Sequence, residues 1–133
     1  MIRRRAPGYM TEDLELQVTG GPARYTSRTG GPVDHVLLRT SEGEVMGYIY
    51  VNDDDDAAGW QPQAGASPAA QNHAALWVIT LRECKQRGLK PRAALDEILG
   101  TTHPGSYVVA GSLGRSESLG ALQELAGRQE PPE

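Results

Sequence analysis

The chain has 133 residues, which fits one domain, and its formal net charge of −4 is unfavourable for a protein that binds nucleic acid. Its single cysteine, Cys84, excludes an intramolecular disulfide and a multi-cysteine metal site. No apolar run approaches the roughly 20 residues of a membrane-spanning helix, and no hydrophobic region follows the basic residues at the start. The expected location is therefore the cytoplasm, and the excess of arginine over lysine is typical of GC-rich bacterial genomes.

The tetrapeptide Thr-Gly-Gly-Pro occurs twice, at residues 19–22 and 29–32, and each copy predicts a turn between two strands. Glycine adopts positive φ without a steric penalty, and proline cannot donate a hydrogen bond to a β-ladder. A third turn is expected at residues 41–43, because Gly43 suits the left-handed position of a short hairpin loop. Together these turns predict a four-stranded antiparallel β-meander over about residues 12–51.

The strands expected in this meander are 12–18, 23–27, 33–40 and 45–51. In the first of them, Leu14, Leu16 and Val18 alternate with polar residues, which is the pattern of a strand with one wet face. The last strand is apolar on both faces, so we expect each face to be covered. Its first face carries the aliphatic residues Val45, Ile49 and Val51, and its second face carries Met46, Tyr48 and Tyr50.

Helical signals follow the meander after a polar stretch at residues 52–66, which is expected to form a long loop. Ser67 is a good N-cap and Pro68 a good first residue for a helix over residues 68–87. Spacings of three and four residues predict one buried face on this helix, made of Ala70, Ala74, Trp77, Leu81 and Cys84.

The remaining predicted elements are a second helix over 91–99, a short fifth strand over 107–110 and a C-terminal helix capped by Ser116 or Ser118. This order predicts an α+β fold, in which the helices pack mainly on one face of the antiparallel sheet. The domain is expected to span residues 12–127, between a flexible arm at residues 1–11 and a disordered tail at residues 128–133.

Metal-binding patterns in the sequence are weak. The run from Asp53 to Asp56 has four consecutive carboxylates, whereas a Ca²⁺ loop alternates its acidic ligands with other residues. We therefore predict a solvated loop and no metal, with Asp53 and Asp55 as ligands in the alternative case. The three histidines, at 35, 73 and 103, lack the i, i+4 spacing of a helical zinc site.

Catalytic patterns are equally weak. Ser112 follows Gly111 directly, so its surroundings depart from the G-x-S-x-G arrangement of a hydrolase nucleophile. Cys84 lies near the end of a predicted helix, where the helix dipole opposes thiolate formation. No catalytic residue and no cofactor are therefore predicted.

The residues predicted to contact a ligand or a partner are Met46, Tyr48, Tyr50, Trp60 and His73. Aromatic residues and methionine are enriched at protein interfaces, and His73 lies one turn before Trp77 on the long helix. The favoured hypothesis is a non-catalytic interaction or regulatory domain that binds a protein partner or forms a homodimer, without nucleic acid or membrane. The alternative is a small-ligand or divalent-ion binding module in the cleft between the 68–87 helix and the 52–66 loop, and an enzyme ranks third.

Overall fold

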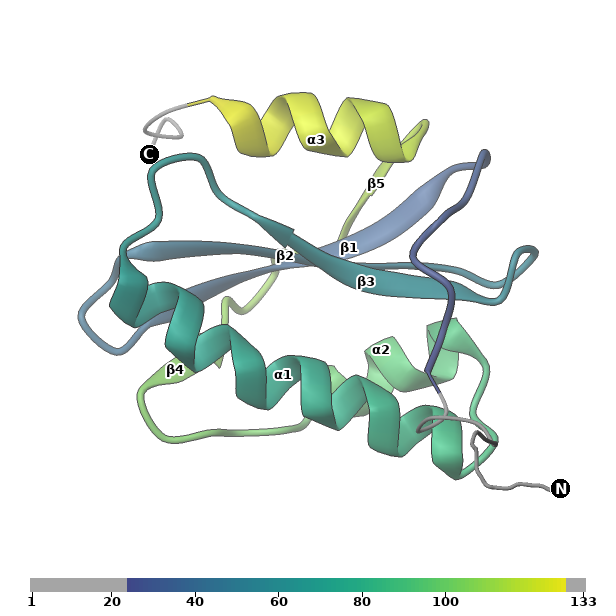
Figure 1. Cartoon of the computed structure of the whole chain (residues 1–133), viewed down its shortest axis with the longest axis horizontal. Helices are drawn as coiled ribbons and strands as arrows, with labels where there is room; N and C mark the ends of the chain where they lie inside the picture. The colour runs from purple at the N-terminus through teal and green to yellow at the C-terminus, as the bar shows by residue number, and fades with distance from the viewer. Residues whose placement is uncertain (1–23, 129–133) are drawn as a thin grey trace, which may run out of the picture.

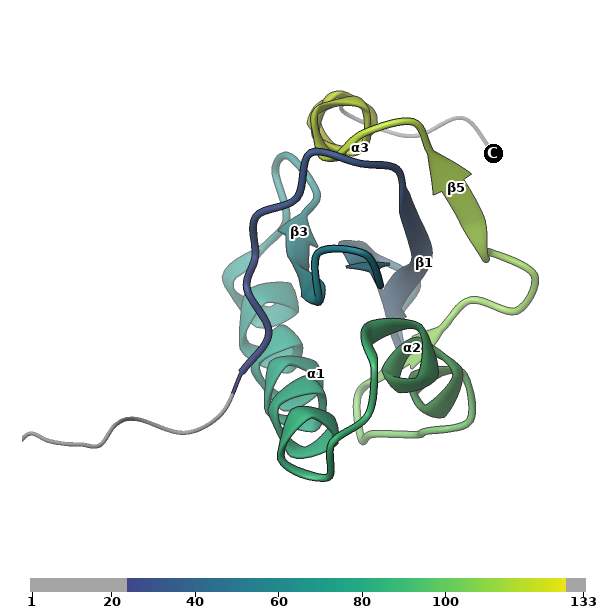
Figure 2. The same ribbon diagram turned by 90° about the vertical axis from the view of Figure 1, so that its right-hand side faces the viewer.

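The structure is a computed structural model, and it describes residues 24–128. Its elements are, in chain order, β1 (Val33–Thr40), β2 (Val45–Asn52), β3 (Ala57–Pro62), α1 (Pro68–Gln86), α2 (Pro91–Leu99), β4 (Ser106–Val108), β5 (Gly114–Ser116) and α3 (Leu119–Gly127). The antiparallel sheet has the strand order β3-β2-β1-β4, and β5 also pairs with β1. Helices α1 and α2 cover one face of this sheet, and α3 lies on the other face (Figures 1 and 2). The α+β class predicted from the sequence is thus confirmed.

The predicted strands at 33–40 and 45–51 appear as expected, whereas the one at 23–27 does not. Strands β1 and β2 form an antiparallel hairpin, and Gly43 has the positive φ of 95° that its turn requires. The segment at 23–27 contributes only a single parallel bridge, between Thr26 and Ala57. The strand expected at 12–18, the arm at 1–11 and residues 129–133 of the tail lie outside the described residues.

The stretch at 52–66 is not one long loop, because it contains β3. Its aspartates form a tight turn in which the side chain of Asn52 accepts a hydrogen bond from the backbone N–H of Asp55 (2.8 Å) and Asp56 has a positive φ of 51°. Ala57, Ala58 and Gly59 have weak strand propensity. They nevertheless extend the sheet, because the turn returns them alongside the strongly β-forming strand β2.

A β-bulge in β2 overturns the prediction that Met46, Tyr48 and Tyr50 share one face. Leu38 pairs with Gly47 while Arg39 pairs with Val45, so Met46 is an extra residue on β2. Such an insertion shifts the alternation of side chains by one position. Met46 is therefore buried against α1 and α2, whereas the two tyrosines are buried on the opposite face.

Each face of the sheet has its own apolar core. The core under α1 and α2 contains the whole predicted face of the long helix, and Trp77 at its centre is fully buried. The core under α3 consists of Val33, Tyr48, Tyr50, Leu122 and Ala126. Ser118 caps α3 by accepting a hydrogen bond from the backbone N–H of Ala121 (3.0 Å), which decides between the two predicted capping serines. None of the helices between residues 24 and 128 is both long and apolar enough to cross a membrane.

Candidate functional site

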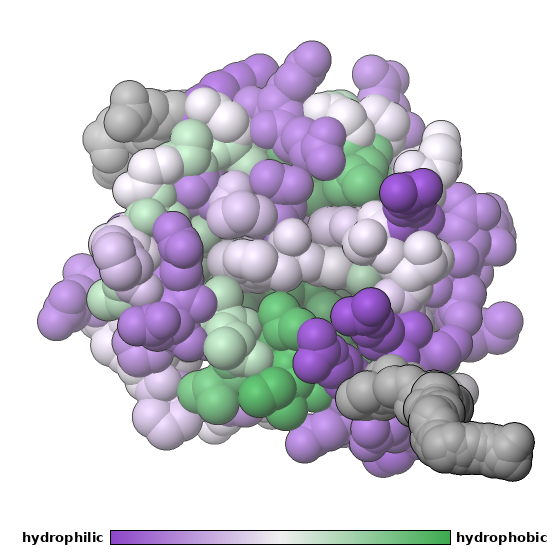
Figure 3. Space-filling view, in the orientation of Figure 1, coloured by the Kyte–Doolittle hydropathy of each residue, from purple (hydrophilic) through white to green (hydrophobic). Residues whose placement is uncertain are grey.

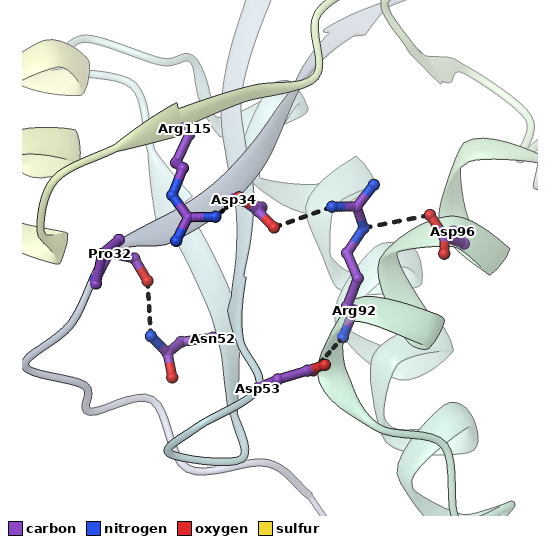
Figure 4. A network of polar contacts seen from close by, with 7 residues as sticks. All are labelled: Pro32, Asp34, Asn52, Asp53, Arg92, Asp96 and Arg115. Carbon is purple, nitrogen blue, oxygen red and sulfur yellow. Dashed lines mark hydrogen bonds and ion pairs between the residues drawn. The ribbon is translucent and has the colours of Figure 1, made fainter.

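Carboxylates of the turn between β2 and β3 hold neighbouring segments in place. Asp53 accepts a hydrogen bond from the backbone N–H of Arg92 at the start of α2 (2.7 Å; Figure 4). Asp55 accepts hydrogen bonds from the hydroxyl of Thr29 (2.6 Å) and the backbone N–H of Gly30 (3.3 Å). The two carboxylates thus bind different segments, and residues 24–128 contain no group of three or more His, Cys, Asp or Glu residues that could hold a metal ion.

Millimolar Ca²⁺ or Mg²⁺ is therefore expected to leave the melting temperature unchanged. An ion at a hundred times its Kd would stabilise the fold by roughly 2.7 kcal/mol, which a thermal melt detects easily. The control is the double variant Asp53→Asn/Asp55→Asn, melted with and without the ion. A rise in melting temperature with Ca²⁺ that disappears in this variant would show that the turn binds the ion.

A polar cavity of about 220 Å³ lies beside this turn, and the two arginines that line it are paired with carboxylates. Asp34 on β1 accepts hydrogen bonds from the guanidinium groups of Arg92 (3.0 Å) and Arg115 (3.1 Å) (Figure 4). Arg92 also pairs with Asp96 at 3.3 Å. Each guanidinium that lines this cavity is thus paired with a carboxylate, and neither is left as an unpaired cation within the described part of the chain.

One histidine that lies close to a serine hydroxyl is His35 on β1. Its Nε2 lies 2.9 Å from the hydroxyl of Ser116, a contact between residues too distant in the sequence to be foreseen. The ring is buried, and burial lowers the pKa of His35 below its usual value. Its Nδ1 has no hydrogen-bond partner among the described residues, so no carboxylate orients the ring as in a catalytic triad.

The other candidates for catalysis or binding also have structural surroundings. His103 lies 2.9 Å from the hydroxyl of Thr80 and packs edge-on against Trp77. His73 is half-buried, and its ring lies against Gly105. Cys84 is buried, and burial raises the pKa of its thiol, which disfavours the nucleophilic thiolate.

An apolar groove of about 590 Å³ lies between β3 and α1. We call it the β3/α1 groove; its apolar lining comprises Trp60 and Pro62 from β3 and Ala74, Ala75, Val78 and Ile79 from α1. Figure 3 shows hydrophobic surface gathered over α1 below β3. The groove lies where the sequence predicted a cleft, between the long helix and the 52–66 segment.

A smaller pocket of about 90 Å³ extends this groove toward the start of the described chain. Trp60, Val78 and Arg82 line both, so they form one continuous depression. Arg24 and Tyr25 line only the small pocket and mark its end. The depression therefore runs along β3 toward the segment that precedes β1.

Strand β3 lies at one edge of the sheet, and some of its outward-pointing backbone groups lack a hydrogen-bond partner within the described part of the chain. The N–H of Ala58 points outward and donates to the carbonyl of Thr26 (2.9 Å). Backbone direction alternates along a strand, so the N–H and C=O of Trp60 also point outward. Among residues 24–128 these two groups have no hydrogen-bond partner, which makes this edge a template for another strand.

The predicted contact residues divide between the groove and the two cores. Trp60 is half-buried and lines the groove, whereas Met46, Tyr48 and Tyr50 are buried and do not line it. His73 is not part of its lining either. The sequence analysis did not predict that residues of α1 line a groove. The signal for it is that the middle of this helix is apolar nearly all round, which leaves apolar side chains outside the buried face. One of them is Ile79, which is 47% exposed in the structure.

No protein-family model matches the chain, and no similar curated protein or solved structure was found.

Proposed function

We propose that this domain binds an extended peptide segment of a partner protein, which adds to β3 as a further strand. The observation that carries this function is the backbone of the β3 edge, where Trp60 has no hydrogen-bond partner among residues 24–128, beside an apolar groove. In strand addition, main-chain hydrogen bonds supply affinity, and pockets for alternate side chains supply specificity. The β3/α1 groove offers both kinds of contact.

The groove favours a peptide with alternating apolar residues. Successive side chains of a strand point to opposite faces, so every second residue of an added strand would face α1. That helix presents small and branched apolar side chains, with Ala75 and Ile79 exposed on its surface. An alternating peptide would cover this surface while its remaining side chains stay in water.

Charge around the groove favours an acidic peptide. Arg82 lines both the groove and the small pocket that extends it, and Arg24 lines the small pocket. No carboxylate between residues 24 and 128 lies within ion-pair distance of either guanidinium. A carboxylate on the peptide would therefore find a cation at this end of the groove.

The other functions predicted from the sequence have less support. The homodimer was predicted from an exposed stripe of Met46, Tyr48 and Tyr50, and all three side chains are buried within the chain. A small ligand usually binds where most of its surface is enclosed, whereas the groove is open. Self-association and a location in the bacterial cytoplasm thus stay predictions from the sequence, and we assign no catalytic activity.

The test is a selection of groove-binding peptides from a phage-displayed library of random sequences, using the full chain as bait. Recovered peptides should alternate apolar residues and carry acidic ones. Ile79→Glu should weaken their binding by about tenfold or more, because it places a charge on the apolar floor of the groove.

The matched control for this test is Leu113→Glu, because Leu113 is similarly exposed (43%) and does not line the groove. This variant should bind the selected peptides as tightly as the unaltered chain does. Peptides that bind the Ile79→Glu variant with unchanged affinity, or a selection that yields no specific peptide, would contradict the proposed function.

A further inference from the structure

The small pocket that extends the β3/α1 groove is suited to the end of a peptide chain. On the basis of the proposed function, we infer that the peptide which adds to β3 is the C-terminal segment of its protein. Its terminal carboxylate binds Arg24 and Arg82, and the segment runs antiparallel to β3. The site thus selects chain ends over internal segments.

Two arginines line this pocket, which has a volume of about 90 Å³. Arg24 precedes β1, and Arg82 lies in the last part of α1. Neither guanidinium has a carboxylate within ion-pair distance among residues 24–128. Two cations beside one small pocket repel each other, and an anion bound there relieves this repulsion. Because a carboxylate accepts strong hydrogen bonds from guanidinium groups, the pocket favours a ligand that carries one.

The outer edge of β3 is occupied at its start. Thr26 forms a parallel bridge with Ala57, and its carbonyl accepts a hydrogen bond from the backbone N–H of Ala58 (2.9 Å). Figures 1 and 2 show the segment that precedes β1 passing the start of β3. A strand that adds beside Trp60 therefore meets this segment at Ala58, where it has to end or turn away. A chain end meets this condition without a turn.

The orientation of the peptide follows from the position of the pocket along β3. The small pocket is lined by Ala58, Gly59 and Trp60, whereas Pro62 lines only the groove. The pocket therefore lies toward the N-terminal end of β3, which begins at Ala57. A peptide whose C terminus lies in the pocket runs opposite to β3. The parallel orientation would instead place a positively charged N terminus beside two arginines.

The backbone groups of β3 define which part of the peptide is bound. Two directly opposite residues of an antiparallel ladder can exchange both of their backbone hydrogen bonds. Trp60 offers both groups, whereas the N–H of Ala58 is bonded to Thr26 and Pro62 has no N–H. The peptide residue opposite Trp60 therefore makes two main-chain hydrogen bonds. Since Ala58 lies two residues away, this peptide residue is the last or the last but one.

The side chain of that peptide residue is expected to be apolar. Directly opposite residues of antiparallel strands have their side chains on the same face of the sheet. Trp60 packs against the core under α1 and α2, and Val78 of α1 lines the pocket and the groove together with it. The opposite side chain therefore also faces α1. The ligand is thus a C-terminal segment with an apolar residue at one of its last two positions.

The test is a pair of selections with the full chain as bait. One phage library displays random short peptides with free C termini, and the other displays the same peptides followed by a fixed extension of glycine and serine. We expect specific peptides from the first library. Each recovered peptide is then synthesised as the free acid and as the carboxamide. The carboxamide should bind at least about tenfold more weakly, because it lacks the charge that binds the two arginines.

The double variant Arg24→Gln/Arg82→Gln removes both cations from the pocket. The free acid and the carboxamide should bind this variant with affinities within about twofold of each other, because the terminal charge no longer has a partner. The matched control is Arg28→Gln. Arg28 is exposed, belongs to the same segment as Arg24 and lines neither the pocket nor the groove. This control should keep the full preference for the free acid.

The possible results separate this inference from the proposed function. Peptides that bind equally well as free acid and as carboxamide, yet are weakened by Ile79→Glu, would overturn the inference and leave the proposed function intact. A preference for the free acid that persists in Arg24→Gln/Arg82→Gln would also overturn it, because another group would then bind the terminus. Failure of both libraries to yield a specific peptide would contradict the proposed function itself, and the inference with it.

Discussion

Replacing Trp77 by alanine is expected to lower the free energy of unfolding by about 3–5 kcal/mol. Trp77 is fully buried between α1 and the sheet, so its removal leaves a large apolar cavity. Its Nε1 also donates a hydrogen bond to the hydroxyl of Ser106 (2.8 Å), and Ser106 is itself buried. The substitution thus removes core volume and leaves a buried hydroxyl without its donor.

Urea denaturation followed by circular dichroism measures this loss without relying on tryptophan fluorescence. The matched control is Leu76→Ala, which removes an apolar side chain of the same helix that is 38% exposed. This variant should lose less than about 1.5 kcal/mol, because an exposed side chain leaves no closed cavity. Equal losses in the two variants would show that the helix packs through another face.

Gly47→Ala is expected to destabilise the fold by about 2–6 kcal/mol, through backbone strain and overpacking of about 1–3 kcal/mol each. Gly47 has a φ of 150°, which side-chain-bearing residues rarely adopt. A Cβ at this position would lie 2.3 Å from the carbonyl oxygen of Gln61 and 2.9 Å from the Cα of Pro62. Since both neighbours are backbone atoms of β3, the two strands would have to separate.

Thermal and urea unfolding measure the effect of Gly47→Ala. The control is Gly127→Ala at the end of α3, where an added Cβ meets no atom within 4 Å. This control should leave stability unchanged or raise it by up to about 1 kcal/mol. If Gly47→Ala has the same free energy of unfolding as the unaltered chain, the prediction is wrong, and the backbone of β3 does not lie in close contact with Gly47.

Elements whose signals are local could be predicted from the amino-acid sequence. The buried face predicted for the long helix is buried in full, and Ser67 accepts a hydrogen bond from the backbone N–H of Ala70 (3.1 Å) as an N-cap. The hairpin around Gly43 is likewise confirmed. Caps, turns and helical periodicity depend on residues a few positions apart, so one sequence is enough to recognise them.

Features that depend on pairing between distant residues could not be predicted in this way, because they arise when the chain packs together. Strand β3 has little intrinsic β-propensity and exists because β2 offers it a partner. The bulge at Met46 redirects a side chain through a change of register that no periodicity reveals. The β3/α1 groove arises from the same cause, because it lies between an edge strand and a helix face whose exposure is set by the packing of the whole domain.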